Sequence, residues 1–241
     1  MFTFFSMFTS LMLLTGITFA ELPVSEPTSV IWGAKVSPFV RKVLVAMEYK
    51  EIPYQNQDLL PSVILLAINQ EIPEGFSNIS PLGKIPAFQQ GDFSIADSSV
   101  IIAYLEKRHP EHPLYPQNPQ LLARSLWLEK YGDTVLSAVT HTLIIESLIN
   151  PLLKVPTDKV AIQNAIEQEL PPALDYLEKQ LQAPWAGRFF IGNELTVADI
   201  GVSTHLISLK LLLVEIDAKR WPLLSAYLQR ILNEPSFKKV L

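Results

Sequence analysis

The sequence predicts an α/β domain over residues 29–108, followed by an all-helical domain over residues 119–241. Short apolar runs alternate with helical patterns up to residue 108, and few strand signals occur after residue 119. The proline-rich stretch between these parts, residues 109–118, is typical of a linker. At roughly 100–200 residues per domain, the chain is long enough for two small domains.

The composition excludes several kinds of chemistry. The chain has 241 residues, a net charge of −5 and no block of basic residues, which argues against nucleic acid or anionic membrane as a partner. It has no cysteine, which excludes disulfides, cysteine nucleophiles and thiolate metal sites. If the protein performs sulfur chemistry, the sulfur must come from a small molecule. The four histidines lie in the proline-rich linker or in helical runs and predict no metal site.

The N-terminal segment, residues 1–28, is set apart from the rest of the chain. Residues 1–20 are nearly all apolar or hydroxyl-bearing and end in Thr18-Phe19-Ala20, which fits a signal-peptide cleavage site. However, no lysine or arginine precedes Lys35. A secretion signal, a membrane anchor and a spurious or unstructured extension all remain open. Residues 21–28 are interpreted as a linker.

The first domain begins with a β-α-β pattern and ends with a hairpin and a helix. Residues 58–80 between these parts are less regular, with prolines that interrupt a possible helix. The expected elements, in order, are a strand over 30–32, a helix from Ser37 to about 50, a strand from 52, a possible helix over 59–68, a strand ending at 88, a turn at 90–92, a strand over 93–95 and a helix from 97 to 105.

Four long amphipathic stretches make up the second domain, at about 119–149, 158–182, 196–214 and 221–233. Thr196 and Asp199 have the spacing of a capping box, with aspartate in place of glutamate. We therefore interpret Asp199 as structural. Trp127 and Tyr131 lie at helical spacing, where core packing is the default interpretation and a pocket wall is the alternative.

Ser37 precedes Pro38 at the start of a predicted helix, where a serine commonly caps a free backbone amide. That structural role is one interpretation. In the other, the hydroxyl donates a hydrogen bond to an anion held at the helix N-terminus. Such a bond to a charged group contributes about 1.5–3 kcal/mol, which would lower a thiol pKa by about 1–2 units. Ser37 could therefore activate a bound thiol without acting as a base.

Two further motifs fit a peptide-like ligand. Lys84-Ile85-Pro86 precedes a strand, and Pro86 either starts that strand in trans or forms a cis bond that leaves the Ile85 backbone free to pair with a ligand. Asp97 and Ser98 start a helix and serve either as caps or as ligand contacts. In the second interpretation, Asp97 holds an ammonium while the Ser98 hydroxyl and first-turn amides hold a carboxylate. This pairing matches a free α-amino acid end.

Taken in order, these motifs resemble those of glutathione transferases. The segments SPFVRKV at 37–43, GKIPAF at 83–88 and IADSSVIIAYL at 95–105 resemble the glutathione-binding half of that family. The segment FIGNELTVADI at 190–200 is similar to the signature of its C-terminal domain. The likeness covers roughly residues 29–240. It implies a thioredoxin-like N-terminal domain, an all-helical C-terminal domain and a homodimer in which the first domain packs on the partner's first long helix.

The resemblance also implies a role for each site residue. Ser37 would face the glutathione sulfur, Ile85 would pair by its backbone with the cysteinyl portion, and Pro86 would be cis. Asp97 and Ser98 would hold the γ-glutamyl end. Lys84 would either assist with the glycine carboxylate or remain solvated. The family often has glutamate where Asp97 stands, and the stretch 58–78 is longer than a typical connection there.

The sequence therefore favours an enzyme that uses glutathione as co-substrate and attacks a hydrophobic electrophile or a peroxide, in detoxification chemistry. The electrophile is expected between the domains, against helices after residue 118. A glutathione-dependent isomerase or dehalogenase has the same sequence features. The alternative to an enzyme is a non-catalytic module of the same fold that binds a ligand or another protein. The expected location is the cytoplasm, or an exported one if residues 1–20 form a signal peptide.

Overall fold

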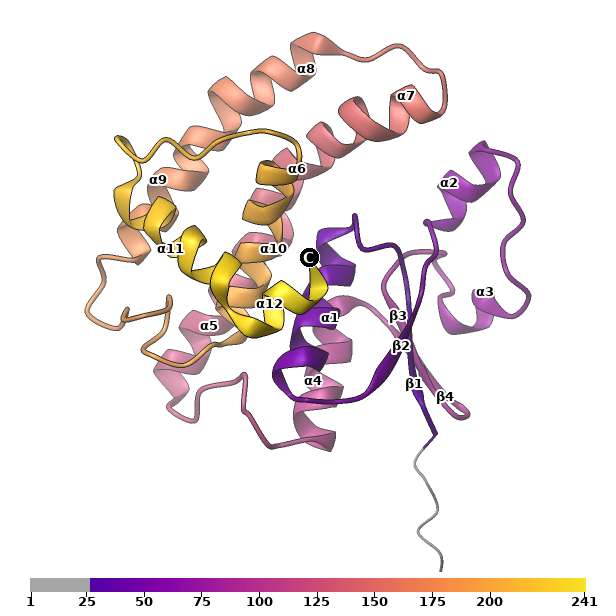
Figure 1. Ribbon diagram of the computed structural model, residues 1–241, viewed down its shortest axis with the longest axis horizontal. Coiled ribbons are helices and arrows are strands. Elements are labelled where there is room, and N and C mark those ends of the chain that lie inside the picture. The colour runs from indigo at the N-terminus through magenta and orange to yellow at the C-terminus, as the bar shows by residue number, and fades with distance from the viewer. Residues whose placement is uncertain (1–26) are drawn as a thin grey trace, which may run out of the picture.

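The computed structural model describes residues 27–241 of the chain. The apolar residues 1–20, with their three interpretations, and most of the expected linker over 21–28 lie outside the described residues. The N-terminal part is an α/β layer and the C-terminal part is helical, which confirms the predicted fold class (Figure 1).

The N-terminal part is built on a four-stranded mixed sheet in the order β2-β1-β3-β4. β1 runs parallel to β2 and antiparallel to β3, and β3 pairs antiparallel with β4. The predicted β-α-β unit and hairpin are both present. The strands are β1 (Ser29–Trp32), β2 (Tyr54–Gln57), β3 (Ala87–Gln90) and β4 (Phe93–Ala96).

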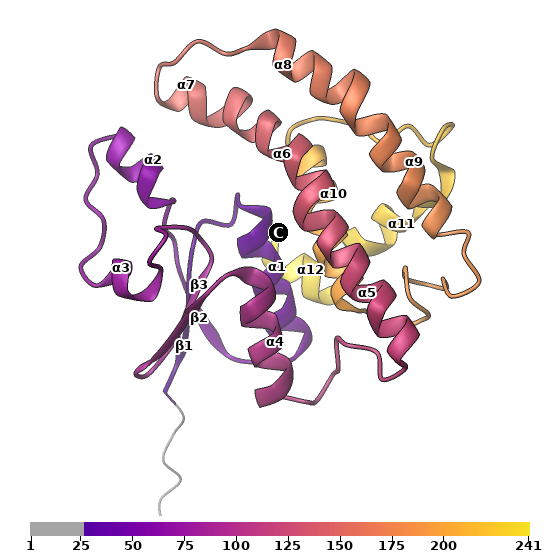
Figure 2. The ribbon, with the colours of Figure 1, turned by 180° about the vertical axis from the view of Figure 1, so that it is seen from behind.

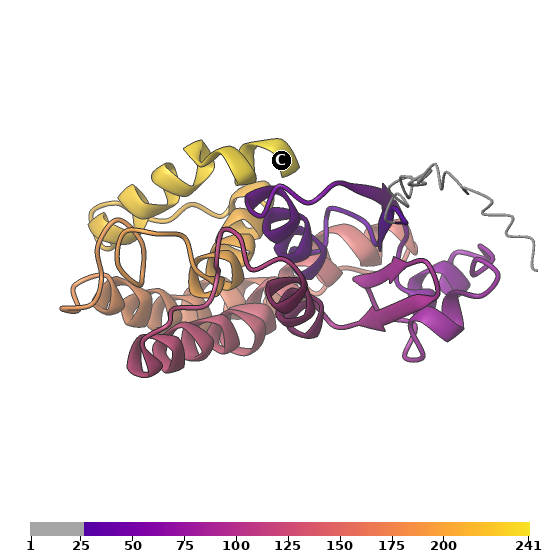
Figure 3. The same cartoon turned by 90° about the horizontal axis from the view of Figure 1, so that it is seen from below.

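Helices cover both faces of this sheet. They are α1 (Pro38–Tyr49), α2 (Ser62–Ala67), α3 (Phe76–Ile79) and α4 (Ser98–Arg108). Because successive strand residues point to opposite faces, Ile31 and Phe88 join the main core with α1 and α4, whereas Trp32 and Ala87 join a smaller cluster with α2 and α3. In Figure 3 the strands accordingly lie between the purple α2–α3 segment and the helices α1 and α4.

The part that the structure describes after residue 118 consists of helices, with one isolated bridge between Ala186 and Gly192. Three short π-helical segments interrupt the longer helices. The elements are α5 (Pro119–Tyr131), η1 (Gly132–Leu136), α6 (Ser137–Ile144), η2 (Ile145–Ile149), α7 (Asn150–Leu152), α8 (Lys159–Asn164), η3 (Ala165–Glu169), α9 (Leu170–Gln180), α10 (Val197–Leu211), α11 (Pro222–Asn233) and α12 (Pro235–Val240).

The run from α5 to α7 forms one long helix, with α8 and α9 beside it (Figure 2). By length and composition alone, this run is the one helix among residues 27–241 that could cross a membrane. Core helices of soluble proteins pass the same test. The run crosses α10 where Gly132 meets Gly201. A Cβ on Gly132 would lie 2.5 Å from the Gly201 carbonyl oxygen, so this crossing requires glycine.

Helix α1 lies between the two parts of the molecule. One side contacts β1 and α4, and the other packs on α10 and α12 of the C-terminal part. The predicted apolar positions Val40, Val43, Leu44 and Met47 are all buried. Because the helix is covered on both sides, two basic residues in it, Arg41 and Lys42, are buried as well.

Three details differ from the sequence-based expectations. The second strand begins at Tyr54 rather than at residue 52, because the segment before it turns back onto α1, where the Ile52 amide bonds to the Met47 carbonyl. Helices α3 and α12 were not expected, since each spans at most six residues and carries little periodic signal. The default core position for Trp127 is wrong, since this side chain is 56% exposed.

Candidate active site

Ser37 lies at the N-terminus of α1, which starts at Pro38. Its Oγ accepts a hydrogen bond from the Val40 amide at 3.4 Å, close to the upper limit for such a bond. The cap role expected from the sequence is therefore present, although it is weak. Because a hydroxyl has one donor and two acceptor sites, the hydrogen of Ser37 remains available to an anion while the oxygen caps the helix.

A cavity of about 470 Å³ lies beside the start of α4. Five of the six residues expected to bind glutathione line it, together with Phe39 from the first turn of α1: Lys84, Ile85, Pro86, Asp97 and Ser98. The Ile85–Pro86 peptide bond is cis, as expected. Ser37 is not among the lining residues, although it stands two residues before Phe39.

Asp97 and Ser98 enter this cavity from the N-terminus of α4 in different ways. Oδ1 of Asp97 accepts hydrogen bonds from the Ser99 and Val100 amides at 3.0 and 3.2 Å. The structure therefore shows the cap role that was one of the two interpretations of Asp97, and the Ser99 and Val100 amides are occupied by the aspartate rather than open to a ligand carboxylate. The Asp97 side chain is exposed, and Ser98 is only 4% exposed at the base of the cavity. Oδ2 of Asp97 and the Ser98 hydroxyl remain for a ligand.

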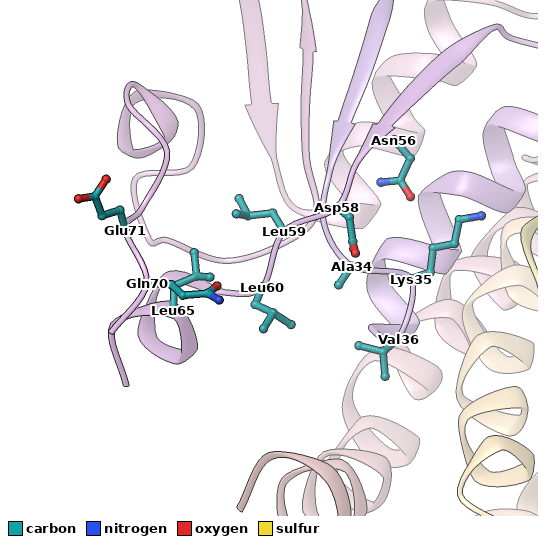
Figure 4. Close-up of a pocket in the computed structure, with 10 residues that line it drawn as sticks. All are labelled: Ala34, Lys35, Val36, Asn56, Asp58, Leu59, Leu60, Leu65, Gln70 and Glu71. Atoms are coloured by element: carbon teal, nitrogen blue, oxygen red, sulfur yellow. The ribbon is translucent and has the colours of Figure 1, made fainter. Parts of the chain in front are cut away.

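A second, larger cavity of about 750 Å³ was not predicted from the sequence (Figure 4). Ala34, Lys35 and Val36, just before Ser37, lie on one side of it, with Leu65, Gln70 and Glu71 on the other. Leu59 and Leu60 lie between the two sides. The irregular stretch 58–78 thus forms much of the wall, and all lining residues come from positions 34–71. The sequence offered one signal for this cavity, the unusual length of that stretch.

Asp199 lies in the first turn of α10 and is fully buried, so the expectation of a structural role fits. Its Oδ2 accepts hydrogen bonds from the Thr196 amide and hydroxyl, and its Oδ1 accepts from the Phe190 amide and the Tyr227 hydroxyl. Burial raises the pKa of Asp199 to about 6. The four hydrogen bonds lower this pKa, but burial has the larger effect. In the part of the chain that the structure describes, no three His, Asp or Glu side chains are grouped as metal ligands.

Comparisons with known proteins agree with this arrangement. Residues 32–113 match the family described as glutathione S-transferase, N-terminal domain, and residues 160–230 match glutathione S-transferase, C-terminal domain. Glutathione S-transferase theta-3 of Mus musculus is 30% identical over 79% of this chain and 76% of its own length. A glutathione S-transferase of Hyoscyamus muticus is 26% identical over 87% of this chain and 95% of its own.

A solved structure extends the likeness to the fold. The crystal structure of a glutathione S-transferase from Rhodospirillum rubrum F11 superimposes with a TM-score of 0.77 and 23% identity, covering 89% of this chain and 92% of that one. An α/β N-terminal part, a helical C-terminal part and a cavity lined by a cis proline together define a thioredoxin-like transferase fold. The chain belongs to the glutathione S-transferase family.

Proposed function

We propose that this chain is a glutathione transferase that binds glutathione in the smaller cavity and activates its thiol beside Ser37. The observation that carries the proposal is the convergence of Lys84 to Pro86 with Asp97 and Ser98 in one cavity, next to the start of α1. These residues come from two separate segments of the chain, and together they offer the groups that a γ-linked tripeptide needs: a carboxylate, a hydroxyl, a free backbone edge and a cation.

Each residue has a distinct role in this proposal. The Ile85 amide and carbonyl pair with the cysteinyl portion. Oδ2 of Asp97 holds the γ-glutamyl ammonium, since Oδ1 is engaged in capping α4. The Ser98 hydroxyl donates to the adjacent carboxylate, and Lys84 stands at the exposed end, where the glycine carboxylate would lie. The thiol would then reach the N-terminus of α1, where the Ser37 hydroxyl and the helix dipole favour the thiolate.

The acceptor molecule would occupy the larger cavity, because its wall includes the two residues just before Ser37. Leu59, Leu60 and Val36 supply apolar surface for a hydrophobic electrophile. This location differs from the expectation of a site against helices after residue 118, since the lining residues all precede residue 72. The thiolate would attack an electrophilic carbon or a peroxide. Most of the catalysis would come from the lowered pKa of the thiol and from the proximity of the two bound substrates. Isomerase chemistry would use the same thiolate.

Calorimetry with glutathione should show binding, and Asp97→Ala should weaken it by tenfold or more, since a charge-assisted contact contributes about 1.5–3 kcal/mol. Asp158→Ala is the matched control. Asp158 caps α8 through two amides, as Asp97 caps α4, but it is not part of either cavity. Its loss should leave glutathione affinity unchanged.

The outcomes of this experiment separate the two classes of function. Absence of binding by the folded wild-type protein at millimolar glutathione would contradict the site and favour a protein-interaction module. Binding without turnover of any electrophile or peroxide in a panel would favour a non-catalytic ligand-binding module.

A homodimer is the proposed assembly. Val100 on α4 is exposed, as are Leu126 on α5 and Val135 on η1, so the first domain and the first long helix both present apolar side chains to solvent. Light scattering should therefore give twice the chain mass of 27.1 kDa. Val100→Glu should shift the mass towards the monomer, whereas Leu213→Glu, at a loop residue that is more open to solvent, should not. A wild-type monomer at micromolar concentration would contradict the assembly.

The proposed location is the cytoplasm, where reduced glutathione is available as co-substrate. Export remains the alternative if residues 1–20 act as a signal peptide. The intact mass of the mature protein tests the proposal, because loss of about the first twenty residues would indicate processing and export.

A further inference from the structure

Arg41 is a buried cation that contacts no carboxylate among residues 27–241. It is 2% exposed, and its guanidinium donates to the carbonyl oxygens of Lys35 at 2.8 Å, Val36 at 3.0 Å and Thr204 at 3.0 Å, and to the Ser208 hydroxyl. All four acceptors are neutral. Within residues 27–241, no ion pair to this guanidinium is formed. Burial lowers the pKa of Arg41 to about 10, so the side chain still carries its charge at neutral pH.

The neighbouring Lys42 shows the opposite arrangement. Its Nζ lies 2.7 Å from a Glu129 oxygen and 2.7 Å from an Asp133 oxygen, and it donates to the Ser99 hydroxyl at 2.8 Å. Two carboxylates, from α5 and η1, therefore contact Lys42, so this cluster carries one excess negative charge. Consecutive residues of α1 thus carry one cation that is paired with carboxylates and one that makes hydrogen bonds to neutral groups alone.

The other ionisable groups near Arg41 do not pair with its guanidinium. Glu129 and Asp133, which carry the excess negative charge next to it, contact Lys42. On α10, His205 is buried, and desolvation together with the charges of Lys42 and Arg41 lowers its pKa to about 3, so it is neutral. Lys35 in the preceding loop is exposed and positive. Asp58 lines the larger cavity with Lys35, but it is exposed to solvent, which screens its charge.

The guanidinium lies at the N-terminal end of α1. Side chains of a helix lean towards its N-terminus, and the bonds to the carbonyls of residues 35 and 36 place this group beside the residue that precedes Ser37. The Val36 carbonyl that it contacts belongs to the peptide bond that joins Val36 to Ser37. The N-terminus of a helix is already positive, so an unpaired buried cation there is unfavourable until an anion binds.

We propose that Arg41 is a positioning residue of the transferase site, whose unpaired charge stabilises the glutathione thiolate at Ser37 while its hydrogen bonds hold the loop of residues 35–36. The inference rests on the proposed glutathione site. A thiolate at the start of α1 would supply an anion close to the guanidinium, whose four hydrogen-bond acceptors are neutral. Thr204 and Ser208 tie the same guanidinium to α10, so the C-terminal half of the protein fixes the position of this charge.

The experiment is a pH titration of bound glutathione, followed by the ultraviolet absorbance of the thiolate, in wild type and three variants. Arg41→Met removes the charge and keeps an unbranched side chain that fills part of the same space. Arg41→Lys keeps the charge but cannot make the four planar hydrogen bonds. Ser208→Ala removes one contact to Arg41 and leaves its charge in place. Calorimetry on the same samples reports glutathione binding, and circular dichroism reports folding.

Arg41→Met should raise the pKa of the bound thiol by about 1 unit, which is about tenfold less thiolate at a pH below that pKa. Arg41→Lys and Ser208→Ala should titrate within a few tenths of a unit of wild type. A purely structural Arg41 would instead make the lysine and methionine variants alike.

Several results would overturn the role of Arg41. One is superimposable titrations of wild type and Arg41→Met, and another is a rise of 1 unit in Arg41→Lys. If Arg41→Met does not fold, Arg41→Gln replaces it as the variant without charge and should show the same rise of about 1 unit. Failure of the wild-type protein to bind glutathione would overturn the site itself and this role with it. Normal binding with an unshifted Arg41→Met titration would overturn this role only.

Discussion

Replacing Asp199 by alanine should lower the free energy of unfolding by about 2–6 kcal/mol, because two buried amides lose their acceptor and each costs about 1–3 kcal/mol. The carboxylate accepts four hydrogen bonds in a fully buried position. The hydroxyls of Thr196 and Tyr227 can rotate towards other acceptors, and Tyr227 already lies 3.0 Å from the Ser203 hydroxyl. The amides of Phe190 and Thr196 cannot, so both would be left buried without an acceptor.

Denaturant unfolding measures this loss against two comparisons. Asp158→Ala removes an exposed helix cap with two amide bonds and should cost about 1 kcal/mol. Asp199→Asn keeps the shape and one acceptor oxygen, so its cost should fall between those of the two alanine variants. If Asp199→Ala were no more destabilising than Asp158→Ala, the hydrogen-bonded network around Asp199 would contribute little to stability.

The pH dependence of the same variants tests the pKa of Asp199. Its folded-state value of about 6 lies above the ordinary value of 3.8. A carboxyl group with a raised folded pKa contributes stability that is complete below the ordinary value and is lost as the pH rises through the folded value. The stability advantage of wild type over Asp199→Asn should therefore shrink between about pH 4 and pH 6. An advantage that grows over this range would mean that the four hydrogen bonds outweigh burial.

Helix starts and the hairpin turn could be predicted from the sequence, because residues next to each other in the chain determine them. Ser37-Pro38 marked the start of α1, and the turn around Gly91 marked the hairpin of β3 and β4. Thr196 and Asp199 marked the start of α10. In each case, a cap or a turn depends on residues within about four positions, so the chain carries the information locally. The contribution of residues 84–86 and 97–98 to one cavity followed from the resemblance to a family, not from local pattern.

Features that depend on packing between distant segments could not be predicted in this way. Arg41 and Lys42 occupy ordinary positions of an amphipathic helix, and their burial results from the packing of α10 and α12 on the second side of α1. The ion pairs of Lys42 join residues about ninety positions apart. The larger cavity likewise forms only when the stretch 58–71 folds against residues 34–36. Periodicity within one segment carries no information about such partners.

Replacing Ser37 by alanine should reduce turnover at neutral pH by about 10–100-fold. The variant loses one hydrogen bond to a charged group, which contributes about 1.5–3 kcal/mol, and each 1.4 kcal/mol corresponds to a factor of about ten. The pKa of the bound thiol should rise by about 1–2 units for the same reason. Glutathione affinity should change much less, because Ile85, Asp97 and Ser98 still hold the peptide. Initial rates with an electrophile and the thiolate absorbance against pH measure both effects.

Two further variants separate this effect from the helix cap that Ser37 also provides. Asn118 is the N-cap of α5 and precedes a proline at the first helical position, as Ser37 does in α1. Asn118→Ala should therefore cost at least as much free energy of unfolding, about 1 kcal/mol, without changing the thiol pKa. Ser37→Thr keeps a hydroxyl and should recover most of the turnover. If the thiol in Ser37→Ala titrates as in wild type, then Ser37 is only a cap, and the backbone amides at the start of α1, together with the charge of Arg41, would have to stabilise the thiolate.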